Sequence, residues 1–313
     1  MIGVFDSGHG GLTVLRALVD ALPQQRFLYL GDHGFAPYGM RSNEEIYQLT
    51  RRRVGELISR GCRLVIIACN TACAVALRRL QQEWLPKHAP DCRVLGVFVP
   101  MIEALTGQEW HVQGVSAYSA KRPPQTIAVF ATRRTVESGA FPAEVKLRAR
   151  HLKVIQQSCP RLAEAVEEGL DDDLMRRAVA RYCDQLMAKA GSAKIDIVVL
   201  GCTHYPILEA HFRAALPRDT RLMSQPDIVA KALVQYLGRH PEFRDTGTEH
   251  STVEFLTSGD PEKVREVSSR FFGADLGFRH LSGWAEPKPD PMPAPPPEES
   301  ETQEEGEETT HDA

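Results

Sequence analysis

The sequence has no uninterrupted apolar run that approaches the roughly 20 residues needed to span a bilayer, so we expect no membrane-spanning helix. It also has no basic stripe with interleaved aromatic residues, which gives nucleic-acid binding little support. The chain opens at Met1 with MIGVFDSG, which has the pattern of a strand, so we expect no signal or transit peptide. With 42% hydrophobic and 25% charged residues, the composition is typical of a soluble globular protein, and we expect a cytoplasmic one.

The seven cysteines form an odd set without the paired C-x-x-C spacing of structural zinc sites. A secreted disulfide framework is also a poor interpretation, so we expect reduced thiols and no metal site. A free cysteine is most often a small buried core residue. We assign that role to Cys62, Cys73, Cys92, Cys159 and Cys183. The other two, Cys69 and Cys202, stand in more informative contexts.

The C-terminal stretch from Glu286 has seven prolines, no aromatic residue, and ten acidic residues against one lysine. Its net charge of −9, within a chain total of −4, leaves +5 for residues 1–285. Such a stretch cannot bury enough apolar surface to offset its ordering entropy. We therefore expect residues 285–313 to form a disordered acidic tail, with a solubilising role favoured over a binding role.

Short apolar runs alternate with amphipathic stretches of helical period along the rest of the chain. The expected strands lie at 3–5, 26–30, 63–68, 93–99, 126–130, 145–149 and 195–200, and the expected helices at 10–22, 44–61, 161–170 and 173–190. This interleaving predicts an α/β fold with mainly parallel sheets covered by helices. In such sheets, ligands bind beyond the carboxyl ends of the strands.

A weak internal sequence repeat indicates two similar halves. IGVFDSG opens one half and IAVFATRRT the other, and each is followed by a later strand that ends in a cysteine. Cys69 comes 64 residues after Phe5, and Cys202 comes 72 residues after Phe130. We expect two similar α/β domains facing each other across a cleft, with these cysteines on opposite walls. Residues 1–98 with 210–284 would form the first domain, and residues 99–209 the second.

Cys202 belongs to LGCTHYP, directly after a predicted buried strand. A thiol at a strand's carboxyl end, next to a helix N-terminus, can have a pKa below the usual value of about 8.5. Two such thiols on opposite sides of one small molecule suit inversion at carbon, because one removes a proton and the other delivers one to the opposite face. Each should have an assisting neighbour. His204 is that neighbour for Cys202, and Asp6 ends the first strand in the half that contains Cys69.

The turn DSGHGG at 6–11 is rich in glycine, and its backbone N–H groups suit an anion. It lacks the Lys-Ser/Thr of a phosphate-binding loop and the spacing of a dinucleotide fingerprint, so carboxylate binding is favoured over nucleotide binding. Neutral donors stand at the same strand ends. They are Ser7, Asn70, Thr71, Thr132, Thr135 and Thr203.

Seven motifs in order are similar to those of the glutamate racemases, in the cofactor-independent aspartate/glutamate racemase superfamily. They are DSGxGG, GD…PYG at 31–39, ACNTA, ATRRTVES, AVEEG, GCTHYP and FLTSGDPEK, and the match runs from Gly3 to about Gly273. The resemblance implies two similar α/β domains and two cysteines that interconvert L- and D-glutamate without pyridoxal phosphate, so no cofactor is expected. It also implies a homodimer and a role in supplying D-glutamate for peptidoglycan.

Carried over by position, the resemblance makes Cys69 and Cys202 the acid/base pair. It makes Asp6, His204, Asp32 and Glu167 assisting residues. The substrate-binding positions that it implies are Ser7, Tyr38, Gly39, Asn70, Thr71 and Thr203, to which the polar strand end adds Thr132. Alternatives remain for three of these residues: Asp6 could cap the following helix, Asp32 could cap a turn, and Glu168 is a rival to Glu167.

The chain departs from the family pattern at a few positions. His9 stands where a small apolar residue is common, His33-Gly34-Phe35 replaces Thr-Ala-Arg, and the segment from Pro100 to Thr126 is longer than usual. We expect these changes near the cleft mouth, where they would affect substrate preference. A racemase of aspartate or another small amino acid therefore stays open, as does a racemase-like scaffold that acts as a regulatory binding protein.

Overall fold

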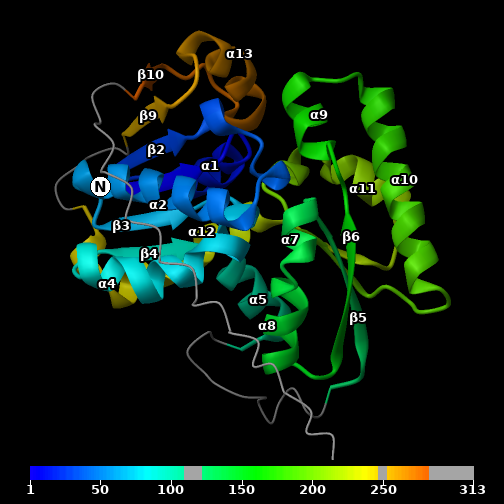
Figure 1. Cartoon of the computed structure of the whole chain (residues 1–313). Helices are drawn as coiled ribbons and strands as arrows, with labels where there is room; N and C mark the ends of the chain where they lie inside the picture. Colours follow the sequence, from blue (N-terminus) through cyan, green and yellow to red (C-terminus); the bar gives the residue numbers. More distant parts are fainter. Residues whose placement is uncertain (109–121, 246–251, 282–313) are drawn as a thin grey trace, which may run out of the picture. The chain divides into compact units, whose positions relative to one another are not determined.

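Parallel strands organise the chain, as the alternating pattern predicts. The computed structural model describes residues 1–108, 122–245 and 252–281. Their strands form two parallel sheets (Figure 1). The first sheet contains β1 (Ile2–Asp6), β2 (Phe27–Gly31), β3 (Leu64–Ile67), β4 (Arg93–Gly96), β9 (Val253–Thr257) and β10 (Phe278–His280). The second contains β5 (Gln125–Ala131), β6 (Leu152–Ser158), β7 (Ile197–Leu200) and β8 (Arg221–Met223). The predicted α/β class is confirmed.

Helices connect these strands. Their bounds are α1 (Gly11–Ala21), α2 (Asn43–Ser59), α5 (Phe98–Thr106), α7 (Arg133–Glu137), α8 (Ala140–Arg148), α9 (Leu162–Glu168), α10 (Asp172–Ala190), α11 (Glu209–Ala215), α12 (Gln225–Arg239) and α13 (Pro261–Phe272). One further helix starts at α3 (Asn70–Ala72), passes through the π-helical segments η3 (Cys73–Leu77) and η4 (Leu80–Trp84), and ends at α4 (Leu85–His88). Short 3-10 turns are η1 (His33–Phe35), η2 (Tyr38–Met40), η5 (Tyr205–Leu208) and η6 (Pro241–Phe243).

Helix starts follow local capping chemistry. Ser42 precedes α2, and its hydroxyl accepts a hydrogen bond from the Glu45 backbone N–H while the Glu45 carboxylate accepts one from the Ser42 N–H. This reciprocal pair satisfies two backbone donors that the helix itself cannot satisfy. Asp260 caps α13 in a similar way, with Pro261 in the first helical position, where its missing N–H has no cost.

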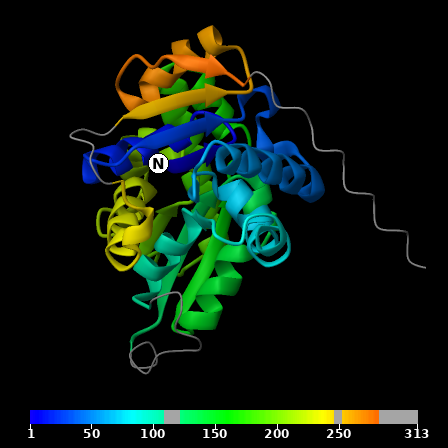
Figure 2. The same ribbon diagram turned by 90° about the vertical axis from the view of Figure 1, so that its left-hand side faces the viewer.

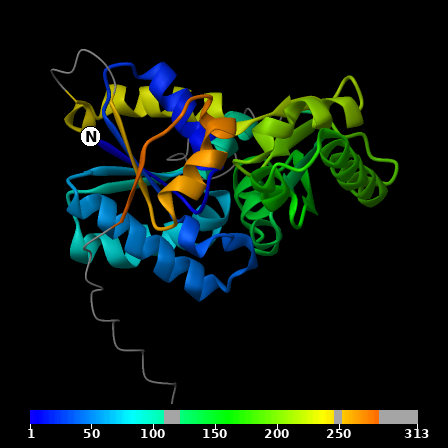
Figure 3. The ribbon, with the colours of Figure 1, turned by 90° about the horizontal axis from the view of Figure 1, so that it is seen from above.

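The first sheet has the strand order β10-β9-β2-β1-β3-β4, which places the N-terminal strand inside it. All five residues of β1 are buried, as expected for a parallel strand covered on both faces. Helices α1 and α12 pack together on one face, and α2 lies on the other (Figures 2 and 3). The second sheet has the order β6-β5-β7-β8, and α8 and α10 both pack against β6.

The two sheets repeat one strand arrangement. In the first, β1 pairs with β2 on one side and β3 on the other, and in the second β5 pairs with β6 and β7 in the same way. Each sheet therefore reverses its strand order beside its own first strand. The crevice at such a reversal, beyond the carboxyl ends of the strands, is where open parallel sheets bind ligands.

The register makes the two cysteines equivalent. Phe5 pairs with the residue two before Cys69, and Phe130 pairs with the residue two before Cys202. The backbone N–H directly before each cysteine donates to the carbonyl of the matching phenylalanine, at 2.7 Å in the first sheet and 2.8 Å in the second. The weak internal sequence repeat thus corresponds to a repeated structural unit.

Two strand predictions were wrong in detail. Residues 145–149 lie at the end of α8 and not in a strand, because the segment from 140 packs Phe141 and Val145 inward at helical spacing. The run 93–99 is strand only to Gly96, and α5 starts at Phe98. An apolar run alone does not separate a buried strand from a buried helix start.

The two sheets belong to one compact unit, Met1–Leu281. Strand β8 at Arg221–Met223 adds to the second sheet although it falls in the segment 210–284 that the sequence assigns to the first domain. The domain boundaries themselves stay a prediction. The predicted acidic tail at 285–313 and most of the long segment between Pro100 and Thr126 lie outside the described residues.

All seven cysteines are free and buried. In the portion of the chain that the structure describes, none of the helices combines the length and the apolar character needed to cross a bilayer.

The contact between α5 and α8 gives a test of the core. Phe141 is fully buried and meets the ring of Phe98 edge-on, with centroids 4.5 Å apart. We expect Phe141→Ala to lower the free energy of unfolding by about 3–5 kcal/mol, because it leaves a cavity in a packed core. Urea unfolding measures the change. Leu147→Ala, on the same helix but 59% exposed, is the matched control and should change it by less than about 0.5 kcal/mol. Equal effects would contradict this packing.

Candidate active site

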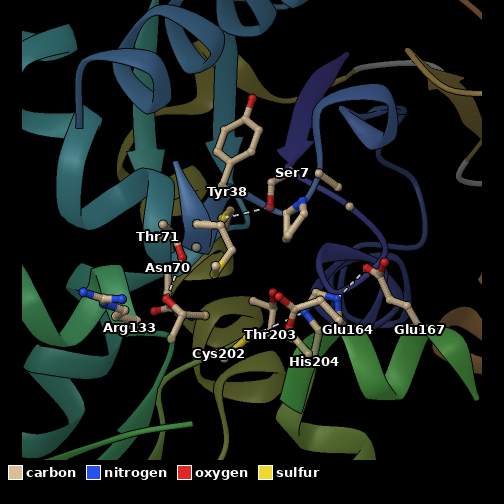
Figure 4. A pocket seen from close by; sticks show the side chains of 18 of the residues that line it. Ser7, Tyr38, Asn70, Thr71, Arg133, Glu164, Glu167, Cys202, Thr203 and His204 are labelled. Carbon is tan, nitrogen blue, oxygen red and sulfur yellow. Dashed lines mark hydrogen bonds and ion pairs between the residues drawn. The ribbon is translucent and has the colours of Figure 1, made fainter. Parts of the chain in front are cut away.

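A cavity lies beyond the carboxyl ends of β1, β3, β5 and β7, at the strand-order reversals of both sheets (Figure 4). Its lining comes from residues 6–8, 69–71, 132–133 and 202–204, with residues 36–40 and part of 159–167. Both predicted cysteines, Cys69 and Cys202, line it. The cavity therefore brings together the residues that follow equivalent strands in the two halves.

Cys69 stands between β3 and α3, and it is the N-cap of that helix. Its sulfur lies 3.3 Å from the Ser7 hydroxyl and accepts from the backbone N–H of Ala72 at 3.5 Å. Burial and the negative charge of Asp6 nevertheless raise the pKa of Cys69 to about 12. The expected lowering at a helix start is not found here, because desolvation and a like charge outweigh the helix terminus. Cys69 is a thiol in this arrangement.

Asp6 ends β1 directly beside Cys69 in the cavity wall. One carboxylate oxygen, Oδ2, accepts from the N–H groups of Gly8 at 3.1 Å and Gly11 at 2.9 Å, so Asp6 does hold the start of α1. The other, Oδ1, is buried without a hydrogen-bond partner among the described residues. Burial raises the pKa of Asp6, although the positive charge of His204 and these two hydrogen bonds oppose it. An unpaired buried acceptor in a cavity wall suits a cationic ligand group.

Cys202, His204 and Glu167 form a chain on the opposite wall (Figure 4). Glu167 Oε1 lies 2.7 Å from His204 Nε2, and His204 Nδ1 lies 3.6 Å from the Cys202 sulfur. Because a carboxylate only accepts, Nε2 carries a hydrogen, and Nδ1 is free to exchange a proton with the thiol. Burial alone would lower the pKa of His204, but Cys202 and Glu167 raise it well above its ordinary value.

The structure distinguishes Glu167 from its sequence neighbour. Glu168 is 54% exposed and pairs with Arg161 at 3.5 Å, whereas Glu167 faces the cavity from α9. Burial would raise the pKa of Glu167, but hydrogen bonds and positive charge from His204 and His9 lower it below its usual range. Glu167 is therefore a carboxylate.

The glycines of the 6–11 turn allow close approach between the two walls. A Cβ on Gly10 would lie 2.3 Å from His204 Nδ1, and one on Gly8 would lie 2.8 Å from Glu167 Oε1. The backbone N–H groups of Gly8, His9 and Gly11 bind the carboxylates of Asp6 and Glu167. Three of the N–H groups that were expected to suit a ligand anion are therefore occupied by the protein's own carboxylates.

Asn70, Thr71 and Thr132 also line the cavity, and Gln225 and Thr135 lie behind them. Asn70 exchanges hydrogen bonds with the buried amide of Gln225, at 2.5 Å and 2.9 Å. The hydroxyl of Thr71 lies 2.9 Å from that of Thr132, which joins the two halves of the site, and Thr135 lies 3.0 Å from Thr132. Thr203 also lines the cavity, and its carbonyl accepts from the hydroxyl of a threonine on α1.

Tyr38 and Gly39, for which the resemblance implies substrate binding, line the cavity, and Asp32 does not. Asp32 is fully buried behind the loop, where it accepts from the Tyr38 hydroxyl at 2.7 Å and from Arg53 Nε at 2.7 Å. Burial and Asp32 raise the pKa of Tyr38 well above its ordinary value. The geometry gives Asp32 a supporting role, since its carboxylate fixes the segment that carries Tyr38.

The unusual residues His9, His33, Gly34 and Phe35 do not line the cavity, contrary to expectation. The His9 and His33 rings lie against each other, with centroids 4.3 Å apart. His33 Nδ1 lies 2.9 Å from Thr257 Oγ1, and the Gly34 N–H donates to the hydroxyl of the following serine in the FLTSGDPEK motif. The altered loop therefore packs against β9 and not at the cavity mouth.

Several lining or supporting residues were missed from sequence, among them Gln225, Arg133 and Glu164. Gln225, the first residue of α12, reaches Asn70 across 155 positions, which no local pattern indicates. Arg133 and Glu164 line the cavity, but each looks like one charge on a solvated helix face. Cys159 is buried, as its core assignment predicts, and it also lines the cavity.

Chemically, this arrangement provides two thiols, each with its own partner for proton transfer. Cys69 has Ser7 and Asp6, and Cys202 has the imidazole of His204. Across residues 1–108, 122–245 and 252–281, the structure places no group of three or more His, Cys, Asp or Glu side chains that could hold a metal ion. The site suits removal of a proton on one side of a small molecule and delivery on the other.

Comparison with known proteins finds similarity to racemases, which also move a proton at a carbon atom. The model of the Asp/Glu/Hydantoin racemase family matches residues 2–233. A glutamate racemase of Ruegeria pomeroyi is 44% identical over 278 residues, which cover 88% of this chain and 98% of the relative. A glutamate racemase of Roseobacter denitrificans is 43% identical over 278 residues, with the same coverage.

Solved structures of glutamate racemases are similar to this chain over most of its length. Glutamate racemase isoform RacE1 from Bacillus anthracis superposes with a TM-score of 0.75 at 29% identity, covering 90% of this chain and 97% of that one. The glutamate racemase of Francisella tularensis, solved in complex with D-glutamate, superposes with a TM-score of 0.75 at 25% identity and the same coverage.

The close approach at Gly10 can be tested directly. We expect Gly10→Ala to displace the His204 ring and to lower the free energy of unfolding by about 1–3 kcal/mol, as overpacking does. Urea unfolding gives the stability, and iodoacetamide labelling read by peptide mass spectrometry gives the accessibility of Cys202, which should change. Gly55→Ala is the control, because its Cβ would meet Trp84 only at 3.6 Å, an ordinary contact. A Gly10→Ala protein with the same free energy of unfolding and the same labelling of Cys202 as the parent would contradict the described geometry.

Proposed function

The chain belongs to the Asp/Glu/Hydantoin racemase family, and on this basis we propose that it interconverts L- and D-glutamate with Cys69 and Cys202 as the two bases. The observation that carries the proposal is that both thiols line one cavity, each with its own proton-transfer partner. Inversion of configuration needs one group on each side of the α-carbon, whereas a nucleophilic cysteine enzyme needs only one thiol.

In the proposed reaction, one cysteine reacts as the thiolate and takes the α-proton. The electron pair left on carbon is delocalised into the α-carboxyl group. The other cysteine, as the thiol, then gives its proton to the opposite face and becomes the thiolate. The two enantiomers thus use the same site with the two roles exchanged, and the overall proton count does not change.

The charges around the cavity support an amino-acid substrate. Asp6 Oδ1 is an unpaired acceptor that suits the α-ammonium group. An ammonium there would bring a positive charge close to Cys69, whose pKa is raised partly by Asp6, and would favour its thiolate form. We assign the two substrate carboxylates to the neutral donors Ser7, Asn70, Thr71, Thr132 and Thr203, with Tyr38 and Gly39 shaping the wall.

His204 and Glu167 serve Cys202 in this scheme. Proton transfer from the thiol to Nδ1 gives a thiolate beside an imidazolium, which the Glu167 carboxylate stabilises through Nε2. Asp32 acts indirectly, because its carboxylate holds the Tyr38 hydroxyl and does not line the cavity. The proposal further includes a homodimer and supply of D-glutamate for peptidoglycan, which rest on family resemblance, and a cytoplasmic location, which rests on the composition of the sequence.

Purified protein incubated with L-glutamate, and separately with D-glutamate, tests the activity. We expect the optical rotation to decay to zero with either enantiomer as the substrate. Cys69→Ser and Cys202→Ser should each lose at least about 10²-fold in kcat/KM, because each removes one of the two bases. The loss should be equal for the two enantiomers, since the equilibrium constant is one.

Cys92→Ser, at a buried position outside the cavity lining, is the matched control and should keep the full rate. Aspartate and other small amino acids are run in parallel. Racemisation of aspartate alone would replace glutamate as the substrate, and no racemisation of any of them would favour a binding role for the scaffold. Retention of activity by either active-site variant would contradict the two-base assignment.

A further inference from the structure

The side chain of Gln225 connects the start of α12 with the cavity wall. Gln225 comes shortly after β8, a strand of the second sheet, and is the first residue of α12. Its side chain is fully buried, and it forms hydrogen bonds with Asn70 and with the backbone of Val97. These two residues follow β3 and β4 of the first sheet. Gln225 does not line the cavity, so its effect on a ligand passes through Asn70, which does.

The carboxamides of Asn70 and Gln225 form a reciprocal pair. Asn70 Nδ2 donates to Gln225 Oε1 at 2.5 Å, and Gln225 Nε2 donates to Asn70 Oδ1 at 2.9 Å. In such a pair each planar amide uses its oxygen and the hydrogen on the same side as that oxygen, so each nitrogen keeps one outer hydrogen. Gln225 Nε2 donates its outer hydrogen to the carbonyl oxygen of Val97, at 3.3 Å.

The Val97 carbonyl determines which way both amides face. Its position is fixed by the sheet, because the Val97 N–H donates to the carbonyl of Ile67, the last residue of β3, at 3.2 Å. A carbonyl oxygen only accepts, so Gln225 must turn its nitrogen, and not its oxygen, toward it. The Gln225 oxygen then faces Asn70 Nδ2. The reverse orientation of either amide would place two acceptors against each other in a buried site, at a cost in free energy.

This network decides what Asn70 presents to the cavity. Asn70 is the first residue of α3 and lies in the cavity lining (Figure 4). Its oxygen and one amide hydrogen are bound to Gln225, and in the described part of the chain the outer hydrogen has no acceptor. A carboxylate oxygen accepts such a hydrogen, whereas an ammonium group cannot. Without Gln225, the carboxamide can turn over and present its oxygen instead.

We propose that Gln225 is a positioning residue that holds Asn70 with an N–H toward the cavity, where it donates to a carboxylate of the substrate. The proposal rests on the function proposed above and deepens it. The backbone carbonyl of Val97 orients Gln225, and Gln225 in turn orients Asn70. A residue at the start of α12 thus makes this part of the wall selective for an acidic group.

The network predicts a split between KM and kcat. Gln225→Met keeps the length of the side chain but removes the carboxamide. We expect KM for both glutamate enantiomers to rise by about 10- to 100-fold, the effect of losing a hydrogen bond to a charged group. We expect kcat to stay within about threefold, because this contact holds the substrate both before and during proton transfer. Gln225→Glu, with at most one hydrogen to donate in place of two, should also raise KM and guards against a folding defect in Gln225→Met.

A double-variant cycle tests whether Gln225 acts through Asn70. Asn70→Ala alone removes the donor and should raise KM by a similar factor. In the Asn70→Ala background, Gln225→Met should change KM by less than about twofold, because the group through which Gln225 acts is already gone. Two factors that multiply would show that Gln225 supports the site in another way, and would overturn the proposal.

Gln157 provides the matched control. It is buried like Gln225, and its Nε2 atom also donates to another amide, that of Gln185 at 2.9 Å, and to a backbone carbonyl, that of Ser158 at 2.6 Å. It does not line the cavity. Gln157→Met should therefore leave KM and kcat unchanged. A rise in KM as large as that in Gln225→Met would mean a general loss of packing and would contradict the positioning role.

A spectroscopic readout does not need turnover. The chain has only two asparagines, Asn70 and the exposed Asn43, so ¹⁵N-asparagine labelling gives two side-chain amide groups in the NMR spectrum. Asn70→Ala assigns them. In the parent, the Asn70 proton bonded to Gln225 should lie downfield and exchange slowly with solvent. In Gln225→Met it should move upfield and exchange faster, while the Asn43 signals stay in place.

These readouts separate the proposal from the function on which it rests. If the Asn70 signals of Gln225→Met are those of the parent, Gln225 does not hold the carboxamide and the proposal is overturned. An unchanged KM, or a fall in kcat alone, would overturn it as well. If the parent protein racemises nothing, the proposed function fails, and the Asn70 signals alone then support or overturn the positioning by Gln225.

Discussion

Parallel pairing of a central strand with a later strand is the constraint on which the site depends. In the first sheet β1 pairs with β3, and in the second β5 pairs with β7, with the same offset between a phenylalanine and a cysteine. Because strand register is fixed by backbone hydrogen bonds, Cys69 and Cys202 reach the carboxyl edges of their sheets at equivalent positions. Ser7 and Asp6 beside Cys69, and His204 beside Cys202, then set the surroundings of these two thiols.

The two thiols are equivalent in position but not in environment. Cys69 has a carboxylate and a hydroxyl beside it, and burial with the charge of Asp6 raises its pKa to about 12. Cys202 has an imidazole in contact with its sulfur and a carboxylate behind that imidazole. In the proposed reaction, a symmetric conversion would therefore use an asymmetric pair of acid/base systems. The glycines of the 6–11 turn make this possible, because they let one wall approach His204 and Glu167 of the other.

The sequence predicts the fold class, most strand positions and the two cysteines, because buried parallel strands give continuous apolar runs and each cysteine directly follows one. It does not predict contacts that depend on how the two halves meet. Gln225 forms a hydrogen bond with Asn70 across 155 positions of the sequence. Asp32 lies behind the cavity wall, where it accepts a hydrogen bond from Arg53. The segment at 145–149 has apolar residues that suit either a strand or a helix, and packing at helical spacing decides it. His9 and His33 both depart from the family pattern, but the contact between their rings is not predicted by the sequence.

The central claim is that two different groups act on opposite faces of one carbon. Incubation of L-glutamate in D₂O, stopped below about 10% conversion, tests it most directly. With two bases, the D-glutamate formed carries solvent deuterium at the α-carbon, because the thiol that delivers the proton has exchanged with solvent, while the recovered L-glutamate keeps its protium. Early D-glutamate that retains the substrate's own α-hydrogen would mean that a single group moves the proton between faces, and would contradict the account.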